Sequence, residues 1–336
     1  MRSYFLKQLI WYNLSTIGVR MYKYSSDLPI LSVCIVTYGQ EKYISQAIDS
    51  VLMQKTKYNF EILVAEDASP DNTREILKRY ENDYPNRFKM LFLNENTYNT
   101  KRNAFIRLFE MALGKYIIVL EGDDYWVDEN KIESQIEFLE THPDYIAVAH
   151  NCVMVDENSD IIDDRYPECK DEEYTIVHWY NNILPGQTTT LMYKNPRYMN
   201  VDFSLMSQGL VPADRLQYYI LATHGRIFCM QKVMSAYRYV ANSGNSYSAN
   251  AKYDFEYFDK WYGSIVEYAR NNSTDHELEC VELMRFLNIR DGIKAGAFTR
   301  KKYFEIKHYN SYGSIAKAYL KRWFRSHILR DEFRLQ

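Results

Sequence analysis

Acidic side chains stand in the sequence directly after two apolar runs of strand-like composition. Glu66 and Asp67 follow the run Phe60–Ala65. The segment Glu121–Asp124, with the sequence EGDD, follows the run Tyr116–Leu120. A carboxylate at the end of a buried strand is costly unless a partner neutralises it, and clustered carboxylates are usually reconciled by a divalent cation. The spacing therefore predicts a site for Mg²⁺ or Mn²⁺, ions that also hold substrate phosphates.

Strand and helix patterns alternate around these acids. Leu31–Thr37 is an apolar, β-branched run typical of a buried strand, whereas Ile44–Gln54 repeats its apolar residues with the period of a helix. Further strands are predicted at Phe60–Ala65, Phe88–Leu93 and Tyr116–Leu120, and further helices at Asn72–Tyr80, Arg102–Ala112 and Lys131–His142. The alternation predicts an α/β fold, with a mostly parallel sheet covered by helices on both faces. Such sheets bind ligands at the carboxyl ends of their strands, which is where the acids stand.

The pattern is less regular after residue 142. A hairpin is predicted from Ile146–Val155 and Ile161–Ile162, a strand at Thr188–Tyr193, a helix at Ala213–Thr223, and two short strands at Ile227–Met230 and Val233–Arg238. From about residue 246 the chain is helical in pattern, charged and aromatic.

The composition is that of a globular protein. The 336 residues are 46% hydrophobic and carry a formal net charge of −3, which gives no global attraction to nucleic acid. The five cysteines are scattered and never spaced as CxxC, which argues against a disulfide framework or a zinc site. We therefore expect a reducing, cytoplasmic location and no nucleic-acid partner.

Both ends of the chain combine basic and apolar residues. Residues 1–27 form a predicted amphipathic extension, whose longest uncharged run, Gln8–Val19, falls short of the ~20 residues that span a bilayer. Residues 300–330 interleave lysine and arginine with aromatic side chains. Basic, aromatic helices suit an anionic membrane surface, so residues 1–24 and 300–330 are candidates for peripheral attachment to the inner face of the plasma membrane. Packing of both segments on the protein body is the alternative.

Several linked motifs carry a family resemblance. The stretch SVCIVTYGQEKYISQAIDSVLMQ…FEILVAEDASPDNT within residues 31–73, followed by GKYIIVLEGDDYW, resembles the inverting family 2 glycosyltransferases of the GT-A fold. The likeness covers roughly residues 28–248. It implies a Rossmann-like GT-A domain over residues 28–245, a mostly parallel mixed sheet, and a helical, basic-aromatic C-terminal region over residues 246–336.

The resemblance assigns the donor-side roles. It implies that Thr37 and Tyr38 line the nucleotide pocket. It also implies that Asp67 hydrogen-bonds the uracil edge, beside Glu66 where an aspartate is commoner. In the EGDD segment the first acid of the metal motif is a glutamate. There the resemblance implies that Asp124 ligates the divalent metal and that Asp123 contacts the ribose or the metal shell.

The resemblance also assigns the acceptor side. Asp214, within Gly209–Arg215, is similar to the family's general base. Arg238 lies in a stretch found near the diphosphate, although many relatives have a histidine shortly after it where this chain has Tyr239–Ala241. Arg238 is therefore a candidate for a contact to the diphosphate. Thr189, in the polar run Gln187–Thr190, is a candidate for holding the donor or the acceptor.

The predicted function is inverting transfer of a sugar from a nucleotide-diphosphate donor, expected to be a UDP-sugar, to a hydroxyl of a glycan or lipid-linked acceptor. A nucleotidyltransferase is an alternative, but Gly39–Lys42 is neither glycine-rich nor strongly basic, as its phosphate loop would be. A catalytically inactive, sugar-nucleotide-binding scaffold subunit at the membrane is another. The presence of Asp67, Asp124 and Asp214 argues against that loss of activity.

Overall fold

The computed structural model describes residues 24–98, 100–163, 170, 172–240, 253–309, 311–317 and 320. The predicted amphipathic segment of residues 1–23 and the tail from residue 321 lie outside the described residues.

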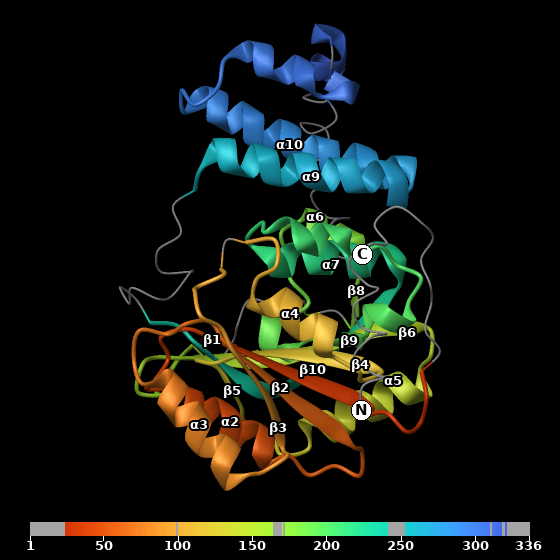
Figure 1. The fold of residues 1–336 in the computed structure, drawn as a ribbon. Helices are drawn as coiled ribbons and strands as arrows, with labels where there is room; N and C mark the ends of the chain where they lie inside the picture. Colours follow the sequence, from red (N-terminus) through yellow and green to blue (C-terminus); the bar gives the residue numbers. More distant parts are fainter. Residues whose placement is uncertain are drawn as a thin grey trace, which may run out of the picture.

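A mixed β-sheet forms the centre of the molecule (Figure 1). Among the described residues it has ten strands, in the order β3-β2-β1-β4-β9-β6-β10-β5, with β7 beside β6 and β8 beside β10. The strands are β1 (Leu31–Thr37), β2 (Phe60–Glu66), β3 (Phe88–Phe92), β4 (Tyr116–Glu121), β5 (Tyr125–Trp126), β6 (Tyr145–Val155), β7 (Ile161–Asp163), β8 (Glu173–Tyr174), β9 (Met192–Lys194) and β10 (Arg226–Arg238). The long ladders, β3-β2-β1-β4 and β6-β10, are parallel, and β9 joins them as an antiparallel strand. The predicted α/β class with a mostly parallel mixed sheet is confirmed.

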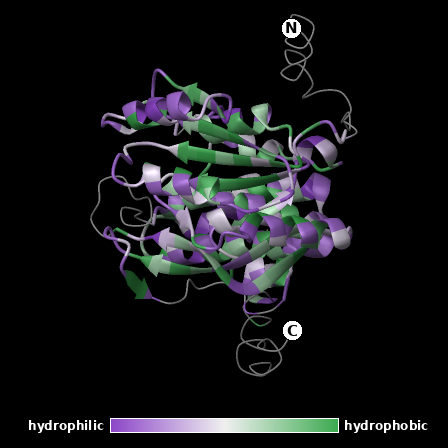
Figure 2. Cartoon of the chain, turned by 90° about the horizontal axis from the view of Figure 1, so that it is seen from below, coloured by the Kyte–Doolittle hydropathy of each residue, from purple (hydrophilic) through white to green (hydrophobic). Residues whose placement is uncertain are grey.

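Helices cover both faces of this sheet, as the alternation predicted (Figure 1). One face packs against α2 (Ile44–Leu52), α3 (Thr73–Asp83) and α5 (Lys131–Thr141), and the other against α4 (Ala104–Met111), α6 (Ile176–Tyr180) and α7 (Ala213–His224). Strand β1 shows why its composition is apolar throughout. Val33 and Ile35 pack into the apolar cluster formed with α2, α3 and α5, whereas Cys34 packs into the cluster formed with α4, α6 and α7. Successive side chains of a strand point to opposite faces of the sheet. Apolar residues accordingly concentrate in the strands, and polar ones on the outward sides of the helices (Figure 2).

Two predicted elements were wrong in form. The strand expected at Thr188–Tyr193 begins as a 3₁₀ turn, Thr188–Thr190, because the Gln187 side chain accepts the Thr189 N–H and competes with the sheet ladder. The two strands expected between Ile227 and Arg238 are a single strand, β10, whose register against β6 shifts between Met230 and Val233. The bulge accommodates two exposed polar residues without ending the strand.

The C-terminal extension packs on the body through helix α9 (Phe255–Asn272), and α10 (Asp275–Lys294) lies against α9 (Figure 1). Trp261 and Ile265 of α9 belong to the same apolar cluster as α6 and α7. The Thr274 hydroxyl and the Glu277 carboxylate form a capping box that starts α10. The helical character predicted for this region therefore holds through α10.

The segment directly after α10 turns in 3₁₀ form, and residues 312–317 are helical again. Residues Arg300–Glu305 and Lys307–Tyr309 are short 3₁₀ turns. Tyr303 and Tyr309 stack on Phe286 of α10, with ring centroids at 5.0 and 4.6 Å, so these aromatic side chains face inward. Within the described part of the chain, no helix is long and apolar enough to cross a bilayer.

Candidate active site

The carboxyl ends of β1, β2 and β4 meet at one edge of the sheet. Thr37 of β1 is in register with Glu66 of β2, and Val36 is in register with Glu121 of β4. The Thr37 side chain is buried and donates to Gln40 Oε1 at 2.7 Å, whereas the next residue, Tyr38, is 38% exposed. This edge therefore offers an exposed tyrosine beside a fixed threonine.

Asp67 is held rigidly at this edge. Its side chain is buried, and Oδ1 accepts hydrogen bonds from the backbone N–H and the hydroxyl of Thr97, at 2.9 and 2.7 Å. The following residue, Ala68, has a φ of 60°. Such a left-handed conformation costs a non-glycine residue of order 1–3 kcal/mol, and strain of this kind concentrates at functional sites.

Glu66 is committed to the fold rather than open to a ligand. Its Oε1 accepts the Ser69 N–H, and its Oε2 forms an ion pair with Arg74, which also donates to the Leu93 carbonyl. Glu66 thus has a positioning role in this structure, and the nucleotide contact expected of it stays a prediction. The longer glutamate reaches Arg74 and fixes the turn that carries Asp67.

Gly122 lets the EGDD segment pass close to the end of β1. A Cβ at this position would lie 2.8 Å from Thr37 Cβ and 2.5 Å from Gln40 Oε1, closer than side chains tolerate. Gln40 also hydrogen-bonds Asp123, which lowers the pKa of Asp123 and partly offsets the rise that burial causes. Gln40 is a site residue that the sequence did not reveal, because a single glutamine in a turn carries no spacing signal.

Asp124 is the most buried acid of the EGDD segment, with 1% of its surface exposed. Its Oδ1 accepts the Arg238 N–H at 2.8 Å. Its Oδ2 is buried and has no hydrogen-bond partner among the described residues. Burial, together with the charges of Asp123 and Glu121, raises the pKa of Asp124 well above its ordinary value.

Arg238 holds the EGDD segment in place. Its guanidinium donates to the carbonyl of Asp123, at 2.9 Å, and to that of Asp156, at 2.6 Å. The same group donates to Gln46 Oε1 and Ser159 Oγ and lies over the Tyr43 ring. All three guanidinium nitrogens are thus used within the protein, and the side chain is 3% exposed. In this structure Arg238 therefore holds the EGDD segment, and its expected contact to the diphosphate stays a prediction.

Thr189 is fully buried. Its hydroxyl accepts the Trp126 indole N–H at 3.2 Å. The neighbouring Gln187 donates from Nε2 to Glu121 Oε2 at 3.3 Å, so Gln187 contacts the acids directly. The expected contact of Thr189 to the donor or the acceptor stays a prediction.

Asp214 completes an acidic cluster, which we define as Glu121, Asp123, Asp124 and Asp214. It lies in the first turn of α7, where its Oδ1 accepts the Arg215 N–H at 2.8 Å. Burial raises the pKa of Asp214. Burial, followed by the charges of Asp123 and Asp214, raises the pKa of Glu121 to about 8. The fold thus brings Asp214 within electrostatic reach of the EGDD segment. Carboxylates with strongly shifted pKa values are often found at functional sites.

The cluster does not by itself form a complete metal-binding set. Among the residues that the structure describes, no three His, Cys, Asp or Glu side chains are placed to hold one ion together. Burial and the neighbouring acids disfavour the charged forms of Glu121 and Asp124, which raises the pKa values of both.

Comparison with known proteins identifies relatives of this fold. An uncharacterized protein of Mycobacterium tuberculosis is 28% identical over 217 residues, which span 62% of this chain and 58% of that protein. The Escherichia coli UDP-Glc:alpha-D-GlcNAc-diphosphoundecaprenol beta-1,3-glucosyltransferase WfaP is 28% identical over 129 residues, 38% of this chain and 49% of that one. The structure of Staphylococcus aureus TarS 1-349 in complex with UDP-GlcNAc superposes with a TM-score of 0.58 at 19% identity, covering 82% of this chain and 75% of that one.

The family model settles the class of protein. The model described as Glycosyl transferase family 2 matches residues 32–202, just over half of the 336-residue chain. The matched segment contains the acidic ends of β2 and β4, and its sheet has the fold of the GT-A glycosyltransferases. This chain spans 58% of the length of its mycobacterial relative, and it belongs to glycosyl transferase family 2.

Proposed function

We propose that this enzyme transfers a sugar from a UDP-sugar to a hydroxyl of a glycan or lipid-linked acceptor, in a single displacement that inverts the anomeric carbon. The observation that carries the proposal is the buried Asp124 Oδ2, which has no hydrogen-bond partner within the described residues and feels the charges of Asp123 and Glu121. Such an arrangement is unfavourable in the free protein, and a bound diphosphate with its cation would balance it.

The residues present fit a divalent cation, Mn²⁺ or Mg²⁺. Asp124 offers its unpartnered Oδ2, and Asp123 lies beside it with a carboxyl whose charge burial disfavours. Carboxylate oxygens are the ligands such ions prefer, and the remaining ligands would come from the donor's phosphates and water. The bound cation would supply Lewis-acid neutralisation of the departing diphosphate. Arg238 keeps the Asp124 carboxylate in place by its backbone N–H, and it needs no contact of its own to the donor.

The nucleoside is assigned to the ends of β1 and β2. Thr97 fixes the Asp67 carboxylate through Oδ1, and we assign Oδ2 to the N–H of the uracil edge. Tyr38 is exposed next to the buried Thr37, so its ring is available to the base or ribose. The UDP-GlcNAc complex of TarS and the UDP-Glc donor named for the E. coli relative support a UDP-sugar for this chain.

Asp214 is assigned as the general base. It would remove the proton of the acceptor hydroxyl while that oxygen attacks the anomeric carbon from the face opposite the diphosphate. A pKa raised by burial makes this carboxylate a stronger base than an exposed aspartate.

The acceptor, like the donor, is inferred from the name of a relative. The name of the E. coli relative gives it a sugar carried on diphosphoundecaprenol, which supports a lipid-linked glycan acceptor here. We propose on this basis that the enzyme works at the inner face of the plasma membrane, where it would meet an acceptor of that kind.

The test combines binding with turnover. UDP, UDP-glucose and UDP-GlcNAc are added with and without Mn²⁺, and the unfolding temperature and the release of UDP are measured. We expect Mn²⁺-dependent stabilisation, because a ligand that binds only the folded state raises its apparent stability.

The Asp124→Asn variant should lose the Mn²⁺-dependent part of both signals while remaining folded. The matched control is Asp83→Asn, at the exposed end of α3, which should behave as the wild type. The proposal fails if no uridine nucleotide stabilises the wild type, and the metal assignment fails if Asp124→Asn retains Mn²⁺-dependent UDP release.

A further inference from the structure

A turn of residues 186–190 contacts both the end of β4 and helix α7, and most of its residues are buried. A Cβ at Gly186 would collide with Thr190 Oγ1 and would lie 3.0 Å from the His150 carbonyl of β6. Glycine therefore allows the turn to pack this closely against the sheet. The Thr190 hydroxyl closes the turn by donating to the Gln187 carbonyl at 2.7 Å. The turn is thus a packed part of the core and not a surface loop.

Two side chains join this turn to the EGDD segment. Gln187 donates from Nε2 to Glu121 Oε2 at 3.3 Å, while its Oε1 accepts the Thr189 N–H at 2.7 Å. The Thr189 hydroxyl accepts the indole N–H of Trp126, which lies two residues beyond the EGDD segment and is 1% exposed. The turn is therefore bonded to the first residue of that segment and to the strand just past its last.

Tyr218 joins the same turn to α7. Its side chain is 1% exposed, and its hydroxyl donates to the Gly186 carbonyl at 3.1 Å. Asp214 stands four residues before Tyr218, so both side chains lie on the same face of the helix, one turn apart. A contact that fixes Tyr218 therefore also fixes the face of α7 that carries Asp214.

We propose that Tyr218 and Gln187 are positioning residues of the transfer reaction. Through the turn between them, they set the position of the Asp214 carboxylate relative to the EGDD segment. The proposal rests on the proposed function, because it takes the base and the donor site from it. A base must lie within hydrogen-bond reach of the acceptor hydroxyl while the donor is held at the acids. A misplacement of about 1 Å can lower a rate by about 10²-fold, so a fixed link between the two sites matters for turnover.

The test follows turnover and structure separately in the full chain. The rate of UDP release from UDP-glucose is measured with Mn²⁺, per folded molecule. The indole N–H signal of Trp126, assigned with Trp126→Phe, is followed in ¹H–¹⁵N NMR spectra. Tyr218→Phe should lower kcat by roughly tenfold, and at most by about 10²-fold, while the KM for UDP-glucose stays the same. The Trp126 signal should shift, because the turn that accepts its N–H loses the contact to α7.

The matched control is Tyr219→Phe, the same change at the next residue of α7. Tyr219 is fully buried, and its hydroxyl pairs with Ser273 Oγ, at the end of α9, at 3.1 Å. The variant loses a tyrosine hydrogen bond from the same helix but none to the turn. It should therefore keep both the kcat and the Trp126 signal of the wild type.

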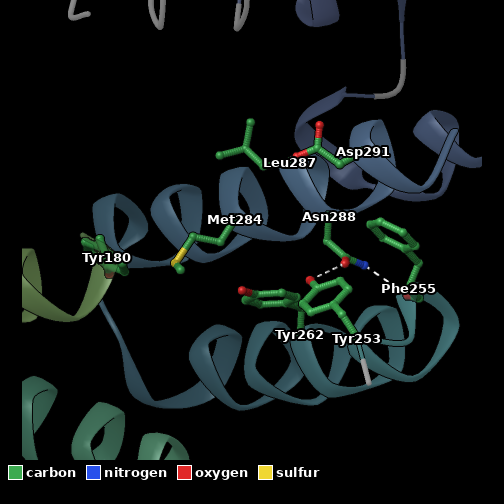
Figure 3. Close-up of a pocket in the computed structure, with 8 residues that line it drawn as sticks. All are labelled: Tyr180, Tyr253, Phe255, Tyr262, Met284, Leu287, Asn288 and Asp291. Carbon is green, nitrogen blue, oxygen red and sulfur yellow. Dashed lines mark hydrogen bonds between the residues drawn. The ribbon is translucent and has the colours of Figure 1, made fainter. Parts of the chain in front are cut away.

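A second control lies in the C-terminal extension, where a pocket of about 530 Å³ opens between α9 and α10 (Figure 3). There the Tyr253 hydroxyl donates to Asn288 Oδ1 at 2.6 Å, and Asn288 Nδ2 donates to the Phe255 carbonyl at 3.1 Å. These partners all belong to the extension. Tyr253→Phe should therefore behave as the wild type in both measurements.

Gln187→Met tests the other end of the turn. It removes the amide that donates to Glu121, and together with Tyr218→Phe it completes a double-mutant cycle. If both residues act through one turn, breaking the link at either end has the same consequence. The double variant should then be little slower than the slower of the two single variants.

The proposal is overturned if Tyr218→Phe leaves either kcat or the Trp126 signal unchanged. It is also overturned if Tyr219→Phe lowers kcat equally, or if the losses of the two single variants multiply in the double variant. A wild type that neither binds nor releases UDP would instead defeat the proposed function. The Trp126 signal is measured without turnover, so it would still show whether Tyr218 is coupled to the EGDD segment.

Discussion

The carboxylates of the C-terminal extension and those of the acidic cluster are buried in opposite ways. In the C-terminal extension, Asp259 accepts Arg285 at 2.7 and 3.3 Å and pairs with Lys302 at 3.0 Å. Burial acts to raise the pKa of Asp259, but the hydrogen bonds from Arg285 and Lys302 outweigh it and lower the pKa. In the acidic cluster, burial and neighbouring acids raise the pKa values together.

The difference separates stabilising charge from functional charge. Asp259 ties α9 to α10 and to the turn that carries Lys302, so its partners are part of the fold. The acidic cluster has Arg238 as an anchor, but Arg238 gives Asp124 only a backbone N–H. A fold that buries charge without compensating it loses stability, and such sites are candidates for ligand binding and catalysis. The comparison therefore predicts that neutralising a carboxylate lowers turnover but not stability in the acidic cluster, and lowers stability but not turnover in the extension.

The largest expected effect is on turnover when Asp214 is neutralised. Asp214→Asn should lower the rate of UDP release from a UDP-sugar by roughly 10²–10⁴-fold, because the general base is lost. Its unfolding temperature near neutral pH should be unchanged or higher. A carboxyl whose folded pKa is raised destabilises the folded state once it is charged. Turnover is measured with saturating donor and Mn²⁺, and unaltered turnover would remove Asp214 from the mechanism.

A change of stability without a change of chemistry is expected in the extension. Asp259→Asn should lower the free energy of unfolding by about 3–5 kcal/mol, because Arg285 and Lys302 lose their buried partner. UDP release per folded molecule should stay the same. Urea denaturation and a turnover assay on the same preparation measure both quantities. The contrast between the regions breaks down if Asp259→Asn loses activity while remaining fully folded.

The smallest expected effect is a shift to higher pH of the acidic limb in the pH dependence of turnover. Asp214 acts as a base only when deprotonated, so turnover should fall as the pH drops through its pKa. Since burial raises that pKa, the limb should lie above the ordinary aspartate value of about 3.9. The measurement is the pH dependence of turnover at saturating donor. A limb at the ordinary aspartate value would mean that the cluster does not perturb its base.

Much of the donor side of the molecule was predictable, because it depends on local patterns. The apolar runs that became β1, β2 and β4 and the acids that follow them were identified from the sequence. Parallel strands place their carboxyl ends at one edge, so those acids had to converge. The class of protein followed from the same motifs and is confirmed by the family model.

Contacts between distant segments were not predictable in the same way. Arg238 and Thr189 were expected near the donor, but one is enclosed by protein acceptors and the other is fully buried. Glu66 was expected to contact the nucleotide, but it pairs with Arg74. Each of these side chains has a type compatible with ligand binding. Its partner lies elsewhere in the chain and carries no spacing signal.

The sequence by itself determined the α/β class, the family and the placement of Asp67 and the EGDD segment at strand ends. Period-two and helical patterns encode which faces are buried, and strand ends follow from them. Only the tertiary structure decided that Asp214 joins this cluster, that Arg238 serves as its anchor, and that α9 and α10 enclose an aromatic pocket. Those outcomes depend on packing between segments far apart in the chain. Burial there sets the charge of the Glu121–Asp124 acids, which the sequence identified only as a cluster.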